Sequence, residues 1–91
     1  MTNEELRATV LAALRRIAPE VNAAELQPGL PLRDQADLDS MDFLNFLMEL
    51  HRVLGVDVPE KDYTQVATLD GLEAYLRLRV STPAAESAAN Q

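Results

Sequence analysis

A serine surrounded by acids is the feature of this sequence best suited to chemistry. Ser40 lies in the segment DLDSMD, together with Asp37, Asp39 and Asp42, where a turn-rich region meets a strongly apolar one. Serine and aspartate are preferred helix N-caps, and acids near a helix N-terminus offset its dipole, so capping alone accounts for many such pairs. A hydroxyl at this junction is also exposed, and the N–H groups of a helix start tolerate a nearby anion.

Other chemistries fit these residues less well. In an EF-hand-like pattern begun at Asp37, Asp42 stands where the turn glycine is needed and Met48 where a bidentate glutamate closes the shell, so we expect no metal site. His51, the only histidine, could accept phosphate if the chain were a helical phosphotransfer domain. We keep this interpretation as a distant alternative. Such domains usually carry a lysine three residues after the histidine, and the residues that follow His51 here, RVLG, include no lysine. Ser40 lacks the strand-turn-helix context of a nucleophile, so we expect no enzyme activity and no catalytic residue.

The elements before this segment are a helix and a long loop. Thr2 and Glu5 have the spacing of a capping box, which predicts a first helix over residues 3–17, ended by Pro19. Residues 18–39 have little periodicity and are punctuated by Pro and Gly, so they predict a loop pinned by scattered leucines. So long a loop in a small domain is typical of function.

The segment itself opens a second helix over residues 40–54, which Gly55 terminates. A short helix is predicted over 60–63 and a last one, capped by Thr68, up to Val80. The expected fold is therefore an all-α four-helix bundle with a long first loop and a short third helix. The apolar positions expected to face the core are Leu6, Val10, Leu14 and Ile17 in the first helix, Phe43, Leu44, Leu47, Leu50 and Leu54 in the second, and Leu69, Leu72, Leu76 and Val80 in the last.

Length and charge limit the domain count and the kinds of partner. The 91 residues suit one small domain over 1–80, and the segment 81–91 has too little apolar surface to fold, so we expect a disordered tail there. The formal charge of -7 repels nucleic acids and anionic lipids and attracts basic proteins. With no cysteine, no signal peptide and no run long enough to cross a bilayer, the sequence predicts a cytoplasmic protein.

A longer pattern gives Ser40 a specific meaning. The run from Leu32 to Asp42, LRDQADLDSMD, followed by an apolar helix, Val58-Pro59 and finally Thr68-Leu69, resembles the acyl carrier protein family. The resemblance covers about residues 3–80 in the order helix, long loop, helix, short helix, helix. Its sharpest element is the triplet DSM.

The resemblance implies a cofactor and a set of partners. Ser40 matches the serine that a phosphopantetheinyl transferase esterifies with 4'-phosphopantetheine, and Asp39 beside it is expected to be a second residue of the cofactor-binding site. The acids would help a basic, magnesium-loaded transferase to find the site. Further expected partners are acyl-transferring and acyl-modifying enzymes, with the carrier acting as a monomer. Peptidyl and aminoacyl carriers share the bundle and the serine, and they remain the alternative, although the DSM triplet and the acidic charge favour an acyl carrier.

The second helix departs from the family on its expected partner-binding stripe. That stripe places Met41, Asn45, Met48 and Arg52 along one side, with Asp42 beside it, and methionine is common on adaptable binding surfaces. In the family this stripe typically carries glutamates, whereas Asn45 and Arg52 stand at two such places here and His51 replaces another acid. We therefore expect partners in a specialised lipid, polyketide or secondary-metabolite pathway. Phe43 and Phe46 are expected to fill interior space near this helix, where the family often has a small residue at the first position.

Overall fold

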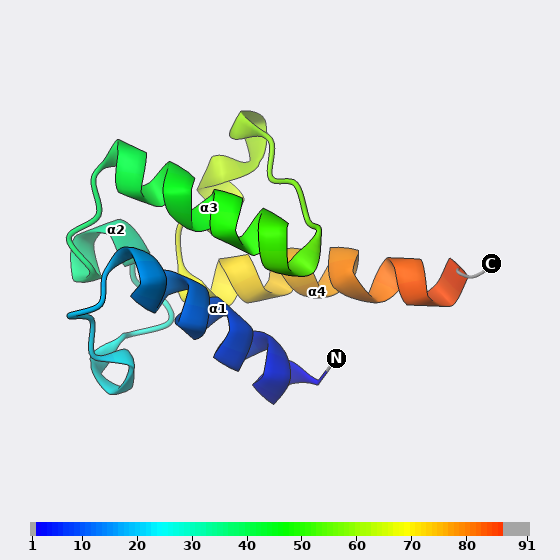
Figure 1. The fold of residues 1–91 in the computed structure, drawn as a ribbon, viewed down its shortest axis with the longest axis horizontal. Helices are drawn as coiled ribbons and strands as arrows, with labels where there is room; N and C mark the ends of the chain where they lie inside the picture. The colour runs from blue at the N-terminus through cyan, green and yellow to red at the C-terminus, as the bar shows by residue number, and fades with distance from the viewer. Residues whose placement is uncertain (1, 87–91) are drawn as a thin grey trace.

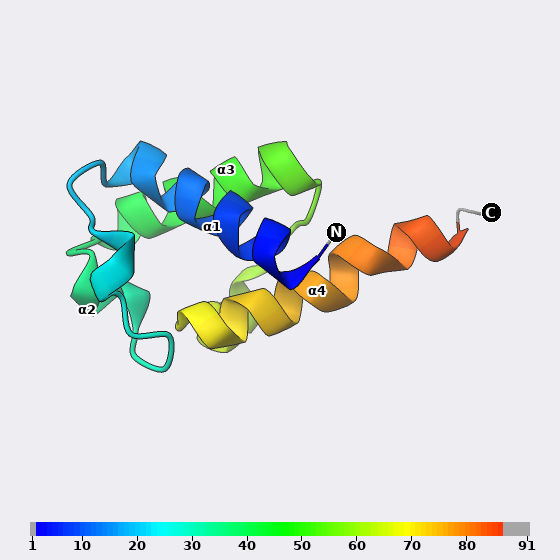
Figure 2. The ribbon, with the colours of Figure 1, turned by 90° about the horizontal axis from the view of Figure 1, so that it is seen from below.

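The computed structural model describes residues 2–86, which form a bundle of helices (Figures 1 and 2). It confirms the all-α fold expected from the sequence. α1 packs against both α3 and α4, and η2, a 3-10 helix, packs against α4. No described helix is long and apolar enough to cross a membrane. In chain order the elements are α1 (Asn3–Ile17), η1 (Ala23–Glu25), α2 (Leu32–Gln35), α3 (Ser40–Leu54), η2 (Glu60–Val66) and α4 (Leu69–Glu86).

The predicted bounds of α1 are confirmed. Thr2 Oγ1 accepts a hydrogen bond from the backbone N of Glu5 at 3.1 Å, and the backbone N of Thr2 donates to Glu5 Oε1 at 2.8 Å. This is the predicted capping box. The helix ends at Ile17, and the backbone N of Ala18 donates to Leu14 O before Pro19 prevents continuation.

The long loop is more structured than predicted. It contains the short helices η1 and α2, and Pro31 forms an isolated bridge with Thr68 at the start of α4. The Gln35 side chain ties the loop to itself, because its Nε2 donates to the carbonyls of Gln27 and Leu30 at 2.8 and 3.0 Å. These bonds join residues that local periodicity does not connect. They hold α2 against the loop segment that precedes it.

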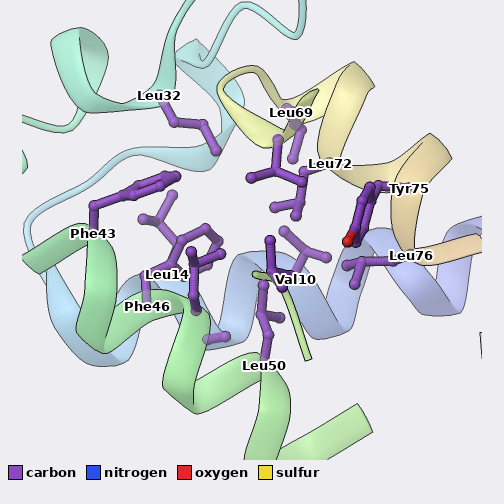
Figure 3. Packing of buried hydrophobic residues seen from close by; sticks show 14 of the residues in the cluster. Val10, Leu14, Leu32, Phe43, Phe46, Leu50, Leu69, Leu72, Tyr75 and Leu76 are labelled. Carbon is purple, nitrogen blue, oxygen red and sulfur yellow. The ribbon is translucent and has the colours of Figure 1, made fainter. Parts of the chain in front are cut away.

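The core consists almost entirely of aliphatic side chains and two phenylalanines, as predicted (Figure 3). One predicted core position is wrong, because Leu44 is 38% exposed, whereas Phe46 is fully buried. Leu44 lies at the edge of the packed surface, where it lines two surface hollows, whereas Phe46 belongs to the buried cluster. Of the other predicted core positions, Ile17, Leu54 and Val80 are partly buried at the rim. The fully buried side chains are Val10, Leu14, Leu32, Phe46, Leu50, Val66, Leu72 and Leu76.

The predicted short helix is a longer 3-10 helix, η2, and a polar cluster fixes it to α4. Tyr75 lies on α4 with its ring buried, and its hydroxyl donates to Asp62 Oδ2 on η2 at 2.6 Å. Burial raises the pKa of Tyr75, and the hydrogen bond to Asp62 raises it further. The Arg79 guanidinium stacks on the Tyr75 ring at 3.4 Å and lies 3.8 Å from Asp62 Oδ2. η2 is thus held against α4 near the candidate site.

Gly71 permits the close approach of α4 to η2, and its replacement should reveal this. A Cβ at position 71 would stand 2.4 Å from the carbonyl oxygen of Gln65, a backbone atom with little freedom to move. We expect Gly71→Ala to lower the free energy of unfolding by about 1–3 kcal/mol, the usual cost of overpacking, although alanine is the better helix former. Urea unfolding measures the change.

Gly29→Ala is the matched control, since a Cβ at position 29 would meet nothing within 4 Å. Its stability should stay within about 0.5 kcal/mol of wild type. A Gly71→Ala variant as stable as wild type, or more stable, would show that helix propensity outweighs the contact with Gln65.

α4 extends beyond its predicted end. The sequence predicted a helix up to Val80, yet the helical backbone continues to Glu86. Extending a nucleated helix needs backbone hydrogen bonds rather than apolar side chains, so loss of hydrophobic periodicity does not by itself end it. The continuation is not ideal, because Pro83 within this stretch has no backbone N–H to donate. In Figures 1 and 2 the last turns of α4 project beyond the other helices. Residues 87–91 of the predicted tail lie outside the described residues, and the domain boundary at residue 80 stays a prediction.

Candidate functional site

Ser40 is the first residue of α3, and its side chain is not the cap of that helix. Asp39 is the N-cap, with its Oδ1 accepting a hydrogen bond from the backbone N of Asp42 at 2.8 Å. In return the backbone N of Asp39 donates to Asp42 Oδ2 at 3.4 Å. Capping therefore explains why Asp39 and Asp42 stand at these positions, but it does not explain Ser40. Ser40 is exposed. The hydroxyl stands at the helix N-terminus in reach of solvent.

Arg33 is a residue of this site that the sequence reasoning missed. Its Nη2 donates to Ser40 Oγ at 3.3 Å, and its Nε donates to the carbonyl of Leu38 at 3.4 Å. Its guanidinium also lies 6.0 Å from the centre of the Phe43 ring. Arg33 precedes Ser40 by seven residues within the run LRDQADLDSMD, but the path of the intervening loop was not predictable. The structure places a fixed positive charge beside the serine.

The turn between α2 and α3 sets the direction of this segment. Asp37 has a left-handed backbone with φ of 55°, a conformation that aspartate tolerates better than most residues. The backbone N of Leu38 closes the turn by donating to the carbonyl of Arg33 at 3.0 Å. The Leu38 side chain is buried in the core, so it anchors the turn. Asp37 itself is exposed, and it adds negative charge near Ser40.

A hollow of about 320 Å³ opens beside Ser40 between α2, α3 and η2. Phe43 forms its inner wall, with its ring packed edge-on to Tyr63 at 5.9 Å between ring centres. Arg33, Leu44 and Glu60 complete the lining. The site thus combines an exposed hydroxyl, one guanidinium, a helix N-terminus and a partly apolar hollow.

Comparison with known proteins gives this arrangement a family. Residues 5–76 match the phosphopantetheine attachment site family. The chain belongs to this family. It is also 23% identical to an acyl carrier protein from Rubrobacter xylanophilus over 73 residues, which are 77% of this chain and 90% of that protein. No solved structure matches the chain significantly.

Membership identifies a carrier protein of the acyl carrier family, with covalent 4'-phosphopantetheine as its cofactor. The residues around Ser40 fit such a group. A phosphodiester on its Oγ would lie near the Arg33 guanidinium and the backbone N–H groups that begin α3. The hollow beside Ser40 leaves room for the start of the arm. Among the acids around Ser40, Arg33 would be the side chain that pairs with this phosphate.

The expected partner-binding stripe of this carrier domain forms one exposed face of α3. Met41 and Met48 are 65% and 67% exposed, and Asn45 and Arg52 are exposed as well. Asp42 differs from them, because it is half-buried and its carboxylate takes part in the cap. The structure therefore shows the exposure of the stripe, and its contact with partners stays a proposal.

Arg52 is engaged in an ion pair that the sequence did not predict. Its Nη2 and Nε lie 2.6 and 3.1 Å from the two carboxylate oxygens of Glu49, and Arg16 Nε from α1 lies 3.1 Å from the same carboxylate. The hydrogen-bonded guanidinium of Arg52 lowers the pKa of Glu49. Two guanidiniums around one carboxylate leave this end of α3 with a net positive charge, in a chain whose net charge is -7.

Proposed function

We propose that this chain is an acyl carrier protein that holds acyl intermediates as thioesters on a 4'-phosphopantetheine arm attached to Ser40. The observation that carries the proposal is the division of roles at the start of α3. Asp39 caps the helix, so the hydroxyl of Ser40 is exposed and available for esterification. The relative named as an acyl carrier protein supports an acyl cargo over an aminoacyl one.

The residues of the chain position the arm and do not catalyse a reaction on it. When bound, the arm supplies a thiol that carries the acyl group. Arg33 and the N-terminus of α3 would hold its phosphodiester, while Asp37 and Asp39 present negative charge to a basic transferase. Tethering turns the search for a free substrate into a local encounter at high effective concentration.

A loading experiment tests this function directly. The protein is incubated with coenzyme A, magnesium and a broad-specificity phosphopantetheinyl transferase, and its intact mass is measured. We expect a gain of one phosphopantetheine per chain. If a set of such transferases leaves the wild-type mass unchanged, the proposal is wrong.

The pathway proposed for this carrier is a specialised one, in lipid, polyketide or secondary-metabolite synthesis. Its support is the charge on α3, where Asn45 and the paired Arg52 replace the acids that housekeeping fatty-acid enzymes usually bind. His51, which is also exposed, stands in place of another of these acids. Such a surface suits a different set of enzymes.

The aromatic wall beside Ser40 leads to a prediction about long acyl chains. Phe43 is buried, lies edge-on to Tyr63 and is 6.4 Å from the ring of Phe46, so the interior behind Ser40 is filled. Opening room there costs about 1–3 kcal/mol. We therefore expect the melting temperature to stay nearly constant from the butyryl to the dodecanoyl form of the holo protein.

Phe43→Ala should open this wall. The variant loses about 3–5 kcal/mol of stability, and a long acyl chain should recover part of it by filling the space. Phe43→Leu, which loses less volume, serves if the alanine variant does not fold. A steady rise of melting temperature with chain length in the wild type would show that the interior is already open.

A further inference from the structure

Basic side chains gather at one place on the surface of this acidic chain. Arg16 of α1 and Arg52 of α3 both pair with Glu49, and their Nε and Nη2 atoms lie 3.1 and 2.6 Å from its Oε2. Arg15 precedes Arg16 in the last turn of α1, and the two line one hollow. We call Arg15, Arg16 and Arg52 the arginine cluster. Its guanidiniums outnumber the carboxylate they share, so the cluster is positive in a chain whose net charge is -7.

The hollow beside the cluster has a volume of about 280 Å³. Arg15 and Arg16 line it together with Ala12 and Pro19, which are exposed and add apolar surface. Among the described residues Arg15 has no partner for a side-chain hydrogen bond or ion pair. Its guanidinium therefore keeps its donors for a group from outside the chain.

The helix dipole explains part of this charge but not the way it gathers. Basic residues in the last turn of a helix offset its dipole, and all three arginines stand in such turns. That effect requires only charge near each helix end. Here α1 and α3 pack side by side, and Arg16 reaches across to a carboxylate on α3 (Figures 1 and 2). The result is one positive surface made by two helices.

A carboxylate on a protein is the group that suits this surface best. Guanidinium groups pair with carboxylates through two parallel hydrogen bonds. A nucleic acid or an anionic membrane presents negative charge over a wide area, so the acids elsewhere on this chain would repel it. A small acidic patch on a protein avoids that repulsion. Val53 lies one helical turn after Glu49 and is 46% exposed, which adds apolar surface that a protein partner would bury.

The cluster lies where a bound partner leaves Ser40 uncovered. Glu49 follows Ser40 by nine residues, which places it about 13 Å further along the axis of α3. Nine steps of about 100° also turn Glu49 to the opposite side of the helix from Ser40. A partner seated on the arginine cluster would therefore approach from the side of α1.

We propose that the arginine cluster is a second docking surface, which binds an acidic patch of a partner protein through its carboxylates while Ser40 stays accessible. Such a surface holds the chain on one protein while the attachment site serves others. The proposal goes beyond the carrier function, because binding at the cluster does not involve the arm. Apo and holo chains should bind the same partner equally well.

The experiment titrates a capped hexaglutamate peptide into the full apo chain at low salt, with the binding followed by nuclear magnetic resonance. The Nε–Hε signals of Arg15 and Arg16 and the amide signals of residues 12–19 should shift with peptide concentration. Signals near Lys61, an exposed basic residue on η2, should shift much less.

Charge reversal shows whether the cluster is responsible. Arg15→Glu should weaken the affinity about three- to tenfold, because it removes one exposed ion pair and adds a repulsive one. Arg15→Gln, which only removes the charge, should give an intermediate affinity. Lys61→Glu is the matched control, since it changes the net charge equally at a residue outside the cluster, and its affinity should stay within about twofold of wild type.

The outcomes separate this inference from the proposed function. A peptide that shifts no signal of the cluster, or that binds Arg15→Glu as tightly as wild type, overturns the docking surface. Equal weakening by Arg15→Glu and Lys61→Glu also overturns it, because net charge then explains the binding. If the holo chain binds the peptide much more weakly than the apo chain, Ser40 is not independent of the cluster. Failure of the loading reaction contradicts the attachment at Ser40 and leaves the titration of the apo chain unaffected.

Discussion

Ser40→Ala should abolish phosphopantetheine loading completely, while the protein keeps its fold. The ester needs the hydroxyl oxygen, and alanine has none. The fold should survive because the cap of α3 belongs to Asp39, and the substitution removes only the bond from Arg33 at 3.3 Å. Intact-protein mass spectrometry measures the loading, and thermal unfolding should show a stability change below about 1 kcal/mol.

A second hydroxyl provides the control for this experiment. Thr64 is exposed on η2, so Thr64→Ala removes a hydroxyl away from the start of α3 and should load like wild type. Detection of a phosphopantetheine on the Ser40→Ala protein would place the attachment elsewhere. A much lower melting temperature of the Ser40→Ala protein would instead contradict the assignment of the cap to Asp39.

The double substitution Asn45→Glu with Arg52→Glu should speed acyl loading by a housekeeping malonyl transferase several-fold to about a hundredfold. Both residues are exposed on α3, where such enzymes usually meet carboxylates. Each exposed ion pair contributes about 0.2–1 kcal/mol, and the substitution allows two of them and also removes the positive charge of Arg52, which repels a basic enzyme. Glu49 would lose Arg52 but keep Arg16, 3.1 Å away, so the fold should persist. The measurement is kcat/KM at low salt.

Salt and a matched variant distinguish local contacts from total charge. Most of the gain should disappear near 1 M salt, where the screening length falls to about 3 Å. Lys61→Glu with Thr64→Glu changes the net charge by the same amount on η2, and it should gain much less. Two results would show that the stripe on α3 does not determine the partner. One is a wild-type kcat/KM that already equals that of a housekeeping carrier, and the other is an equal gain in both double variants.

The sequence alone determined the main helices and the position of the candidate attachment serine. The start of α1 followed from its capping box and the end of α3 from Gly55, because caps depend on residues within one turn of each other. The exposure of Met41 and Met48 followed from the helical period of 3.6 residues, which assigns faces without knowledge of the rest of the fold.

Tertiary structure alone decided which neighbours complete the site. Arg33 reaches Ser40 only because the loop turns at Asp37, and no local rule fixes the path of such a loop. Periodicity names an apolar face but not its edges, so the packing alone showed that Leu44 is exposed. The closeness of Gly71 to η2 and the ion pair between Arg16 and Glu49 likewise join separate elements. Contacts between distant residues arise from how the elements pack together, and a single sequence does not specify that packing locally.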